Sequence, residues 1–224
     1  MPILFPTERG TTALAQSRTK DALRMLEKKM AADNVARTTK VYTSGPDNWE
    51  HIIPTSFSKF TVPPRGIDRV PLGILDRGEE IRRISPELAD TPVVFNDREI
   101  LELNKDAVGR YNSYDDFIGV PGAGTNPWTL NHEGTHAAYL RPTGLSKSAD
   151  RFKTNDDAQS AANVPYDYTK EEIRARMAEN LPDDLEETIS ALNKMYRVQR
   201  NKKGNVVSSS FPPTTWDAEM RLLK

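Results

Sequence analysis

His132-Glu133-Gly134-Thr135-His136 is the stretch of sequence on which the fold prediction rests. It contains two of the chain's 3 histidines, at positions i and i+4. On an α-helix these two positions project from one face, so both imidazoles can reach a single metal ion. The stretch therefore predicts a metal site on one face of a helix, with a glutamate beside the first histidine.

The flanking residues predict the bounds of this helix. Asn126 is suited to the N-cap and Pro127 to the first helical position, whereas the pair Arg141-Pro142 ends the apolar pattern. Gly134 costs roughly 1 kcal/mol relative to alanine inside a helix, a cost that close approach of another backbone would explain. Asn131 is expected to face solvent.

Zinc-dependent hydrolases carry the same pattern, HExxH, in which the two histidines bind Zn²⁺ and the glutamate is the general base. A catalytic zinc needs a third protein ligand. The elongated form of the motif fails, because Tyr139 and Pro142 stand where its glycine and third histidine would be. The remaining histidine, His51, lies in a proline-rich region and is predicted to be a packed or surface residue. We therefore expect a downstream carboxylate as the third ligand.

Two pairs of glutamates are candidates for that ligand. Glu171 and Glu172 open a helix that begins at Thr169, where acidic residues also have an ordinary capping role. Glu186 and Glu187 lie on a second helix, residues 183–199, and are expected in solvent beside its apolar stripe. That stripe consists of Leu185, Ile189, Leu192, Met195 and Tyr196.

The order of a strand, the HExxH helix, a loop and a helix opening Glu-Glu-Ile-Arg-Ala-Arg resembles the gluzincin type of zinc metallopeptidase. It is especially similar to small metallopeptidase domains of phage-encoded proteins and mobile elements, over about residues 93–189. The resemblance implies an α+β, zincin-like fold with a small mixed sheet, an active-site helix and C-terminal helices. In it, Zn²⁺ would be held by His132, His136 and Glu172. Glu133 would be the general base.

The resemblance also implies a reaction and a substrate class. The expected reaction is zinc-dependent hydrolysis of a peptide bond in a peptide or protein. An edge strand at residues 114–120 would line the substrate cleft, where an extended peptide can join a sheet. Tyr166 and Tyr168 are candidates for donating a hydrogen bond to the oxyanion, although buried aromatic residues are common in such places.

The alternative is a structural protein, such as a component of a phage particle, that uses the zincin-like module as a scaffold. Its zinc would be absent or structural. Proline-rich arms in the first ninety residues favour this alternative, because such arms pack against assembly partners. An intact Glu133 argues against it, since a scaffold has no need of a base.

Composition excludes several classes of partner. The chain has 31 basic and 32 acidic residues, and no basic run interleaved with aromatics indicates nucleic-acid binding. With no cysteine, neither a disulfide nor a thiolate-bound metal is possible. We find no apolar run long enough for a membrane segment and no export signal, so cytoplasmic synthesis is expected, with incorporation in a virion under the phage resemblance.

Composition also suggests three regions. Residues 1–90 are predicted to hold a helix at 12–32 and an irregular arm at 33–71 with a short strand at 39–43. Residues 91–200 are predicted to form the metallopeptidase domain, with a strand at 92–95, a short helix at 98–104 and a loop or lid at 145–168. Residues 201–224 read as a turn and a serine-rich tail.

Overall fold

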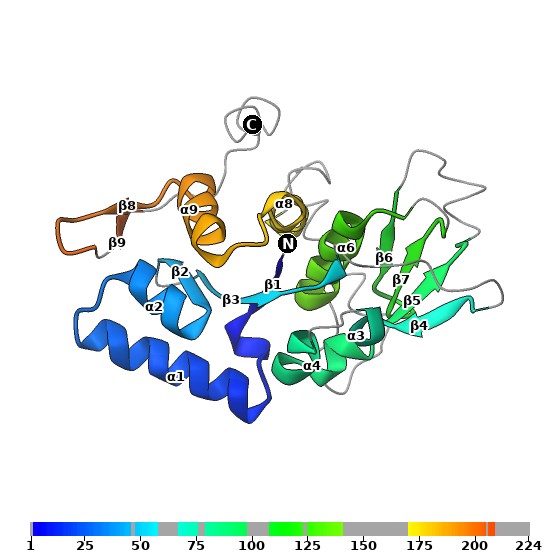
Figure 1. Cartoon of the computed structure of the whole chain (residues 1–224), viewed down its shortest axis with the longest axis horizontal. Coiled ribbons are helices and arrows are strands. Elements are labelled where there is room, and N and C mark those ends of the chain that lie inside the picture. Colours follow the sequence, from blue (N-terminus) through cyan, green and yellow to red (C-terminus); the bar gives the residue numbers. More distant parts are fainter. Residues whose placement is uncertain are drawn as a thin grey trace, which may run out of the picture.

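The computed structural model describes residues 2–45, 48–57, 67–75, 79–97, 108–122, 125–140, 170–204 and 206–208. These residues form helices and three small sheets, so the predicted α+β class is confirmed (Figure 1). No helix in these ranges is long and apolar enough to cross a membrane.

The first sheet joins three antiparallel strands in the order β1-β3-β2. They are β1 (Pro2–Pro6), β3 (Asn48–Pro54) and β2 (Val41–Gly45). The prediction of an irregular arm at residues 33–71 is thus wrong over most of its first half. Pro54 and Pro71 lie at strand ends, which a sheet tolerates. Strand β3 finds its partner β1 some fifty residues away in the sequence, beyond the reach of local patterns.

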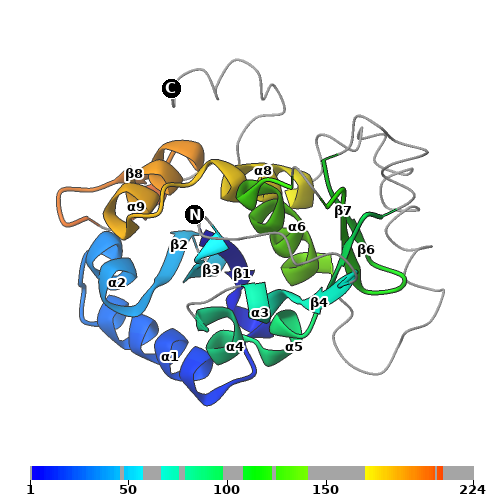
Figure 2. The same ribbon diagram turned by 45° about the vertical axis from the view of Figure 1, so that its right-hand side comes forward.

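Two helices pack beside this sheet in place of the predicted helix at residues 12–32. The first, α1 (Ala13–Glu27), begins where the Thr12 side chain accepts a hydrogen bond from the Ala15 backbone N–H. Lys29 then adopts a left-handed conformation and breaks the helix. The chain continues as α2 (Ala32–Thr39), which lies near the C-terminal helix α9 (Leu185–Met195) in Figure 2.

The second sheet has four strands in the order β4-β5-β7-β6. They are β4 (Arg69–Pro71), β5 (Pro92–Phe95), β7 (Phe117–Val120) and β6 (Arg110–Asn112), and β5 runs parallel to β7. The predicted strand at 92–95 is confirmed. The predicted edge strand at 114–120 is wrong in position: β7 is internal, because the chain folds back through a tight turn and β6 covers its outer side. The terminal strand on that side is β6, and β4 is the terminal strand on the other side.

Short helices and a hairpin complete the described chain. A 3-10 turn, η1 (Thr7–Arg9), follows β1. Along the chain, β4 is connected to β5 by three short helices, α3 (Leu72–Leu75), α4 (Glu80–Ile84) and α5 (Pro86–Ala89). The hairpin pairs β8 (Gln199–Arg200) with β9 (Val206–Ser208). The predicted helix at 98–104, loop at 145–168 and most of the tail lie outside the described residues.

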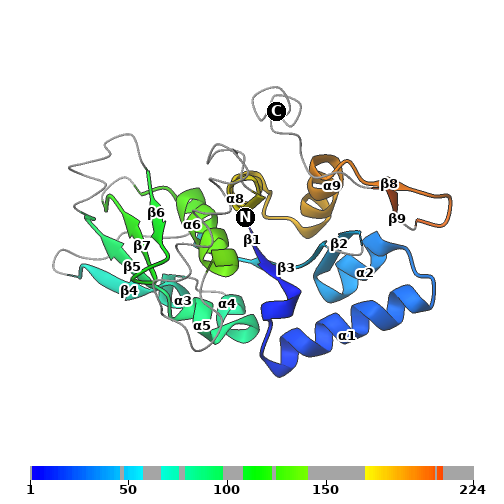
Figure 3. The same cartoon turned by 180° about the vertical axis from the view of Figure 1, so that it is seen from behind.

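The helix that carries the histidines lies at the centre of the fold. This helix, α6 (Pro127–Leu140), has the predicted bounds and lies between α8 (Lys170–Asn180) and the four-stranded sheet (Figures 1 and 3). Its residues Leu130 and Ala137 belong to the main apolar core, and Tyr139 borders the second core. The prediction that Asn131 faces solvent is wrong: the residue is fully buried, and Thr55 offsets the burial of its amide oxygen by donating a hydrogen bond over 2.9 Å.

Gly134 allows β1 to approach α6. A Cβ atom at this position would lie 2.8 Å from Cδ1 of Ile3 and 3.6 Å from a methyl group of Leu72. The close neighbour is therefore a side chain of the first strand, and not another backbone as the sequence suggested. The contact joins the N-terminal strand directly to the helix that bears the histidines.

This contact predicts a coupling between Gly134 and Ile3. Gly134→Ala should gain less than the roughly 1 kcal/mol expected from helix propensity, because Cδ1 must move. Ile3→Val removes that atom at a cost of about 0.5–1.5 kcal/mol. The double variant should be more stable than the sum of the single changes by about 0.5–1.5 kcal/mol. Urea unfolding of the four proteins measures this coupling, and strictly additive changes would contradict the contact.

His51 is a packed histidine, in line with its prediction. Its side chain is fully buried on β3, with Nε2 3.4 Å from the Thr19 hydroxyl and Phe5 nearby. Burial, with a smaller effect from the positive charge of Arg18, lowers the pKa of His51 from 6.5 to about 4. The native state therefore holds this imidazole neutral at pH values where the unfolded chain would protonate it.

The lowered pKa of His51 predicts acid sensitivity. Between pH 6.5 and pH 4 the unfolded chain binds more protons here than the folded chain, so stability falls as the pH falls. From pH 7 to pH 5, wild type should lose about 2 kcal/mol more unfolding free energy than His51→Gln. Other titrating groups are common to both proteins and cancel. Parallel pH profiles from urea unfolding would contradict this assignment.

Candidate metal centre

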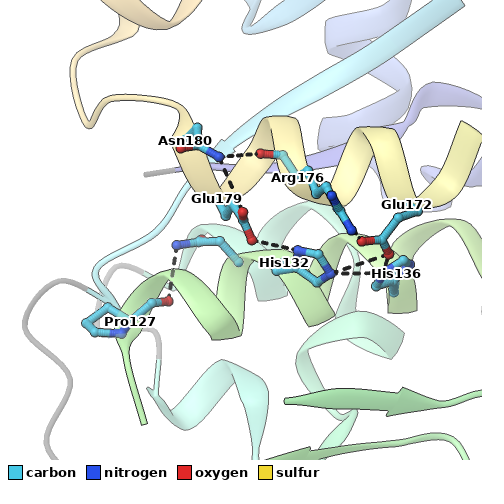
Figure 4. A network of polar contacts seen from close by, with 8 residues as sticks. Pro127, His132, His136, Glu172, Arg176, Glu179 and Asn180 are labelled. Atoms are coloured by element: carbon cyan, nitrogen blue, oxygen red, sulfur yellow. Dashed lines mark hydrogen bonds and ion pairs between the residues drawn. The ribbon is translucent and has the colours of Figure 1, made fainter. Parts of the chain in front are cut away.

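The two histidines of α6 point together toward α8 (Figure 4). Their ring centroids are 4.8 Å apart, and the two Nε2 atoms are separated by 3.1 Å. The i, i+4 spacing on the helix accounts for this proximity. The side chain of His136 is 4% exposed and that of His132 is 15% exposed, so the pair is largely shielded but still borders solvent.

Glu172 reaches the same point from α8. Its Oε2 atom lies 3.0 Å from Nε2 of His136 and 3.7 Å from Nε2 of His132. The carboxylate is 5% exposed. The close packing of α8 against α6 makes this possible, since the three residues come from helices separated by a long connection. The structure thus brings together His132, His136 and Glu172, a group that could hold a metal ion.

The spacing of these three atoms fits a tetrahedral ion. Ligand bonds of about 2.0–2.1 Å at tetrahedral angles place ligand atoms roughly 3.3 Å apart. The observed separations are 3.1, 3.0 and 3.7 Å. A point roughly 2 Å from all three therefore lies just outside their plane. Such an ion would keep a fourth direction that none of the three residues occupies.

Polar contacts behind the three residues fix their orientation. The guanidinium of Arg176 donates through Nε to Oε1 of Glu172 over 2.7 Å, which leaves Oε2 for the histidines. On the far side of His132, Nδ1 lies 2.8 Å from Oε2 of Glu179. The Nδ1 atom of His136 is buried and has no hydrogen-bond partner among the described residues.

The charges in this cluster shift two pKa values strongly. Burial alone would raise the pKa of Glu172, but hydrogen bonds from His132, His136 and Arg176 hold it well below its usual range. Burial lowers the pKa of His132, yet hydrogen bonds to Glu172 and Glu179 outweigh it and raise the value to about 10. The carboxylates therefore favour a positive charge at this point, as a cation site requires.

Glu133 lies on α6 beside His132 and is 5% exposed. Burial raises its pKa, and the nearby imidazoles of His136 and His132 partly offset that rise. Gly109, just before β6, lies against this side chain: a Cβ there would be 3.1 Å from Oε1 of Glu133 and 2.4 Å from a methyl of Thr129. Gly109 has no positive φ. The close approach itself, and not backbone conformation, thus accounts for the glycine.

A buried ionic cluster lies beside the metal centre and was not predicted. Glu50 of β3 is fully buried, accepts a hydrogen bond from Tyr139 of α6 and accepts others from Tyr196 after α9 over 3.1 and 3.2 Å. Nε of Arg174, on α8, is 3.3 Å from the same carboxylate, and its guanidinium stacks 4.5 Å from the Tyr139 ring. Burial raises the pKa of Glu50, although Arg174 opposes this rise. The cluster links α6, α8 and the first sheet around one carboxylate.

The other sequence candidates lie elsewhere. Glu186 and Glu187 are exposed near the start of α9, as expected, and Glu186 pairs with Arg37 over 2.6 Å. Tyr166, Tyr168 and the side chain of Glu171 lie outside the described residues. Glu179 was missed because it belongs to no motif, although its i+7 spacing from Glu172 puts both on one face of a helix.

No protein-family model, curated protein or solved structure matches this chain. The resemblance to gluzincin metallopeptidases and the zincin-like details of the fold therefore stay predictions.

The geometry predicts about one divalent transition-metal ion per chain. Protein grown with added zinc should carry it, as measured by plasma-emission analysis after exhaustive dialysis. His136→Ala removes one of three donors and should lose the ion, whereas the buried His51→Gln, outside the cluster, should keep it. Equal metal content in wild type and His136→Ala would contradict the site.

Proposed function

We propose that this protein is a zinc-dependent hydrolase of peptide bonds. The observation that carries the proposal is the convergence of His132, His136 and Glu172 on one point, with the carboxylate of Glu133 on the same helix. Two neutral nitrogen donors and one carboxylate are a ligand set that suits zinc and leaves a position open for catalysis.

The metal and the base would have separate tasks. A bound zinc ion would polarise a carbonyl group and lower the pKa of a water molecule. Glu133 would accept the proton of the attacking water and deliver it to the nitrogen of the leaving amine. Its burial supports this role, because the raised pKa brings the carboxylate closer to neutral pH, where a base both accepts and returns a proton effectively.

The strand next to Glu133 supports a peptide as the substrate. The chain enters β6, a terminal strand of the four-stranded sheet, through Gly109, which lies against the side chain of Glu133. An extended peptide can add to a terminal strand by backbone hydrogen bonds. A substrate aligned with β6 would then pass beside the proposed base. A role for Tyr168 or Tyr166 at the oxyanion remains a prediction.

The scaffold alternative loses part of its support. It rested on irregular N-terminal arms that pack against assembly partners. In the described part of the chain, however, β1, β2 and β3 form a sheet that packs on α6 and α8 of the same molecule. No observation in these residues favours a structural component of a phage particle over a hydrolase.

The role of Glu133 is tested by Glu133→Gln, which keeps the size of the side chain but removes the base. Cleavage of a random peptide library, followed by mass spectrometry, should fall by about 10²–10⁴-fold, while zinc content and thermal unfolding stay as in wild type. Glu187→Gln, an equal change at an exposed site, is the matched control. If Glu133→Gln cleaves as fast as wild type, the proposed mechanism is wrong. If wild type holds zinc and cleaves no peptide, the proposed hydrolysis of peptide bonds is wrong.

A further inference from the structure

The two imidazoles of the candidate metal centre differ in their outer contacts. Nδ1 of His132 lies 2.8 Å from a carboxylate oxygen of Glu179, whereas Nδ1 of His136 has no hydrogen-bond partner in the described part of the chain. Both residues present Nε2 to Oε2 of Glu172, at 3.0 Å from His136 and 3.7 Å from His132. The difference lies behind the site, and it is made by α8.

The residues of α8 that contact the two histidines lie on one face of that helix (Figure 4). Glu172, Arg176 and Glu179 occupy positions i, i+4 and i+7 and so share a face of the helix. Glu172 faces the histidines, and Arg176 donates a hydrogen bond to it over 2.7 Å. The carboxylate of Glu179 lies 2.8 Å from Nδ1 of His132. The sequence of charges along this face is negative, positive, negative.

Glu179 is itself restrained by its neighbour. The side-chain amide of Asn180 donates through Nδ2 to Oε1 of Glu179 over 3.3 Å and to the backbone oxygen of Arg176 over 2.8 Å. This leaves Oε2 directed at the imidazole, with the side chain 23% exposed. The carboxylate is therefore held on both oxygens, each by a different residue.

We infer that Glu179 is a positioning residue that fixes the ring orientation and the tautomer of His132. A carboxylate at Nδ1 accepts its N–H and so keeps the proton there, which leaves the Nε2 lone pair directed at the metal position. Among the described residues none gives His136 such support, so the two histidines are unequal partners. The inference rests on the proposed metal site but does not depend on catalysis.

The test compares Glu179→Gln and Glu179→Ala with wild type and with Glu187→Gln, the same change at an exposed position on α9. Zinc affinity is measured by competition with a chromophoric chelator. Glutamine retains a weaker, neutral acceptor and alanine retains none, so affinity should fall in the order wild type, Glu179→Gln, Glu179→Ala. A total loss of about 10–100-fold is expected for such an outer contact. Glu187→Gln should bind as wild type does.

A second readout separates positioning from a merely structural role. Proton–nitrogen-15 correlation spectra of the zinc-loaded protein report the Nδ1–H group of each histidine. In Glu179→Gln the proton resonance of His132 should shift upfield, because its acceptor is no longer charged. The signals of His136 should stay in place. Far-ultraviolet circular dichroism checks that each variant is folded. Equal zinc affinity and an unmoved His132 signal in Glu179→Gln overturn the inference, as does a shift of both histidines together.

These outcomes keep the two proposals apart. Wild type that fails to bind zinc overturns both the metal site and this inference. Wild type that binds zinc, with Glu179→Gln unchanged, overturns the inference alone. Wild type that binds zinc through an oriented His132 and cleaves no peptide leaves the inference standing and overturns the proposed hydrolysis.

Discussion

The packing of α8 across α6 is the constraint on which the candidate site depends. One helix contributes two imidazoles through its own geometry, but the third donor comes from the second helix, so the relative position of the helices sets both distances to Glu172. Two features outside the centre hold that position. Gly134 lets β1 lie close against α6, and Glu50 accepts hydrogen bonds or ion pairs from residues of α6, α8 and the turn after α9. The N-terminal sheet is therefore part of the support of the site.

The buried carboxylates of the candidate site favour positive charge beside them. Taking the carboxylates of Glu172 and Glu133 out of water is costly, and the cost is offset by nearby cationic partners. Arg176 donates to Glu172 over 2.7 Å, and hydrogen bonds to Glu172 and Glu179 raise the pKa of His132 to about 10 despite burial. A divalent cation would replace the proton and interact with all three donors at once. Behind His132, the carboxylate of Glu179 lies 2.8 Å from Nδ1, where it can accept the N–H and leave Nε2 for the cation.

Local patterns in the sequence predicted the helices of the site well. Asn126-Pro127 marks the start of α6, the i, i+4 histidines share its face, and the apolar stripe of α9 is buried at Ile189 and Leu192 while Glu186 and Glu187 stay exposed. Of the sheet around β1, the sequence predicted one short strand at 39–43, which overlaps β2; β1 and β3 were not predicted, because both end in proline and pair across about fifty residues. Internal β7 was taken for an edge, since a pattern identifies a strand but not its neighbours. The roles of Glu50 and Glu179 arise only from tertiary contacts, which no spacing rule for a single element encodes.

The central claim is that one metal ion binds between His132, His136 and Glu172. Crystals of zinc-loaded protein, with diffraction data collected on both sides of the zinc absorption edge, test it most directly. The account predicts a single strong anomalous peak that lies about 2.0–2.2 Å from both Nε2 atoms and from a carboxylate oxygen of Glu172. A peak coordinated by other residues, or by Nδ1 of either histidine, would contradict the account, as would the absence of a peak in crystals grown with excess zinc.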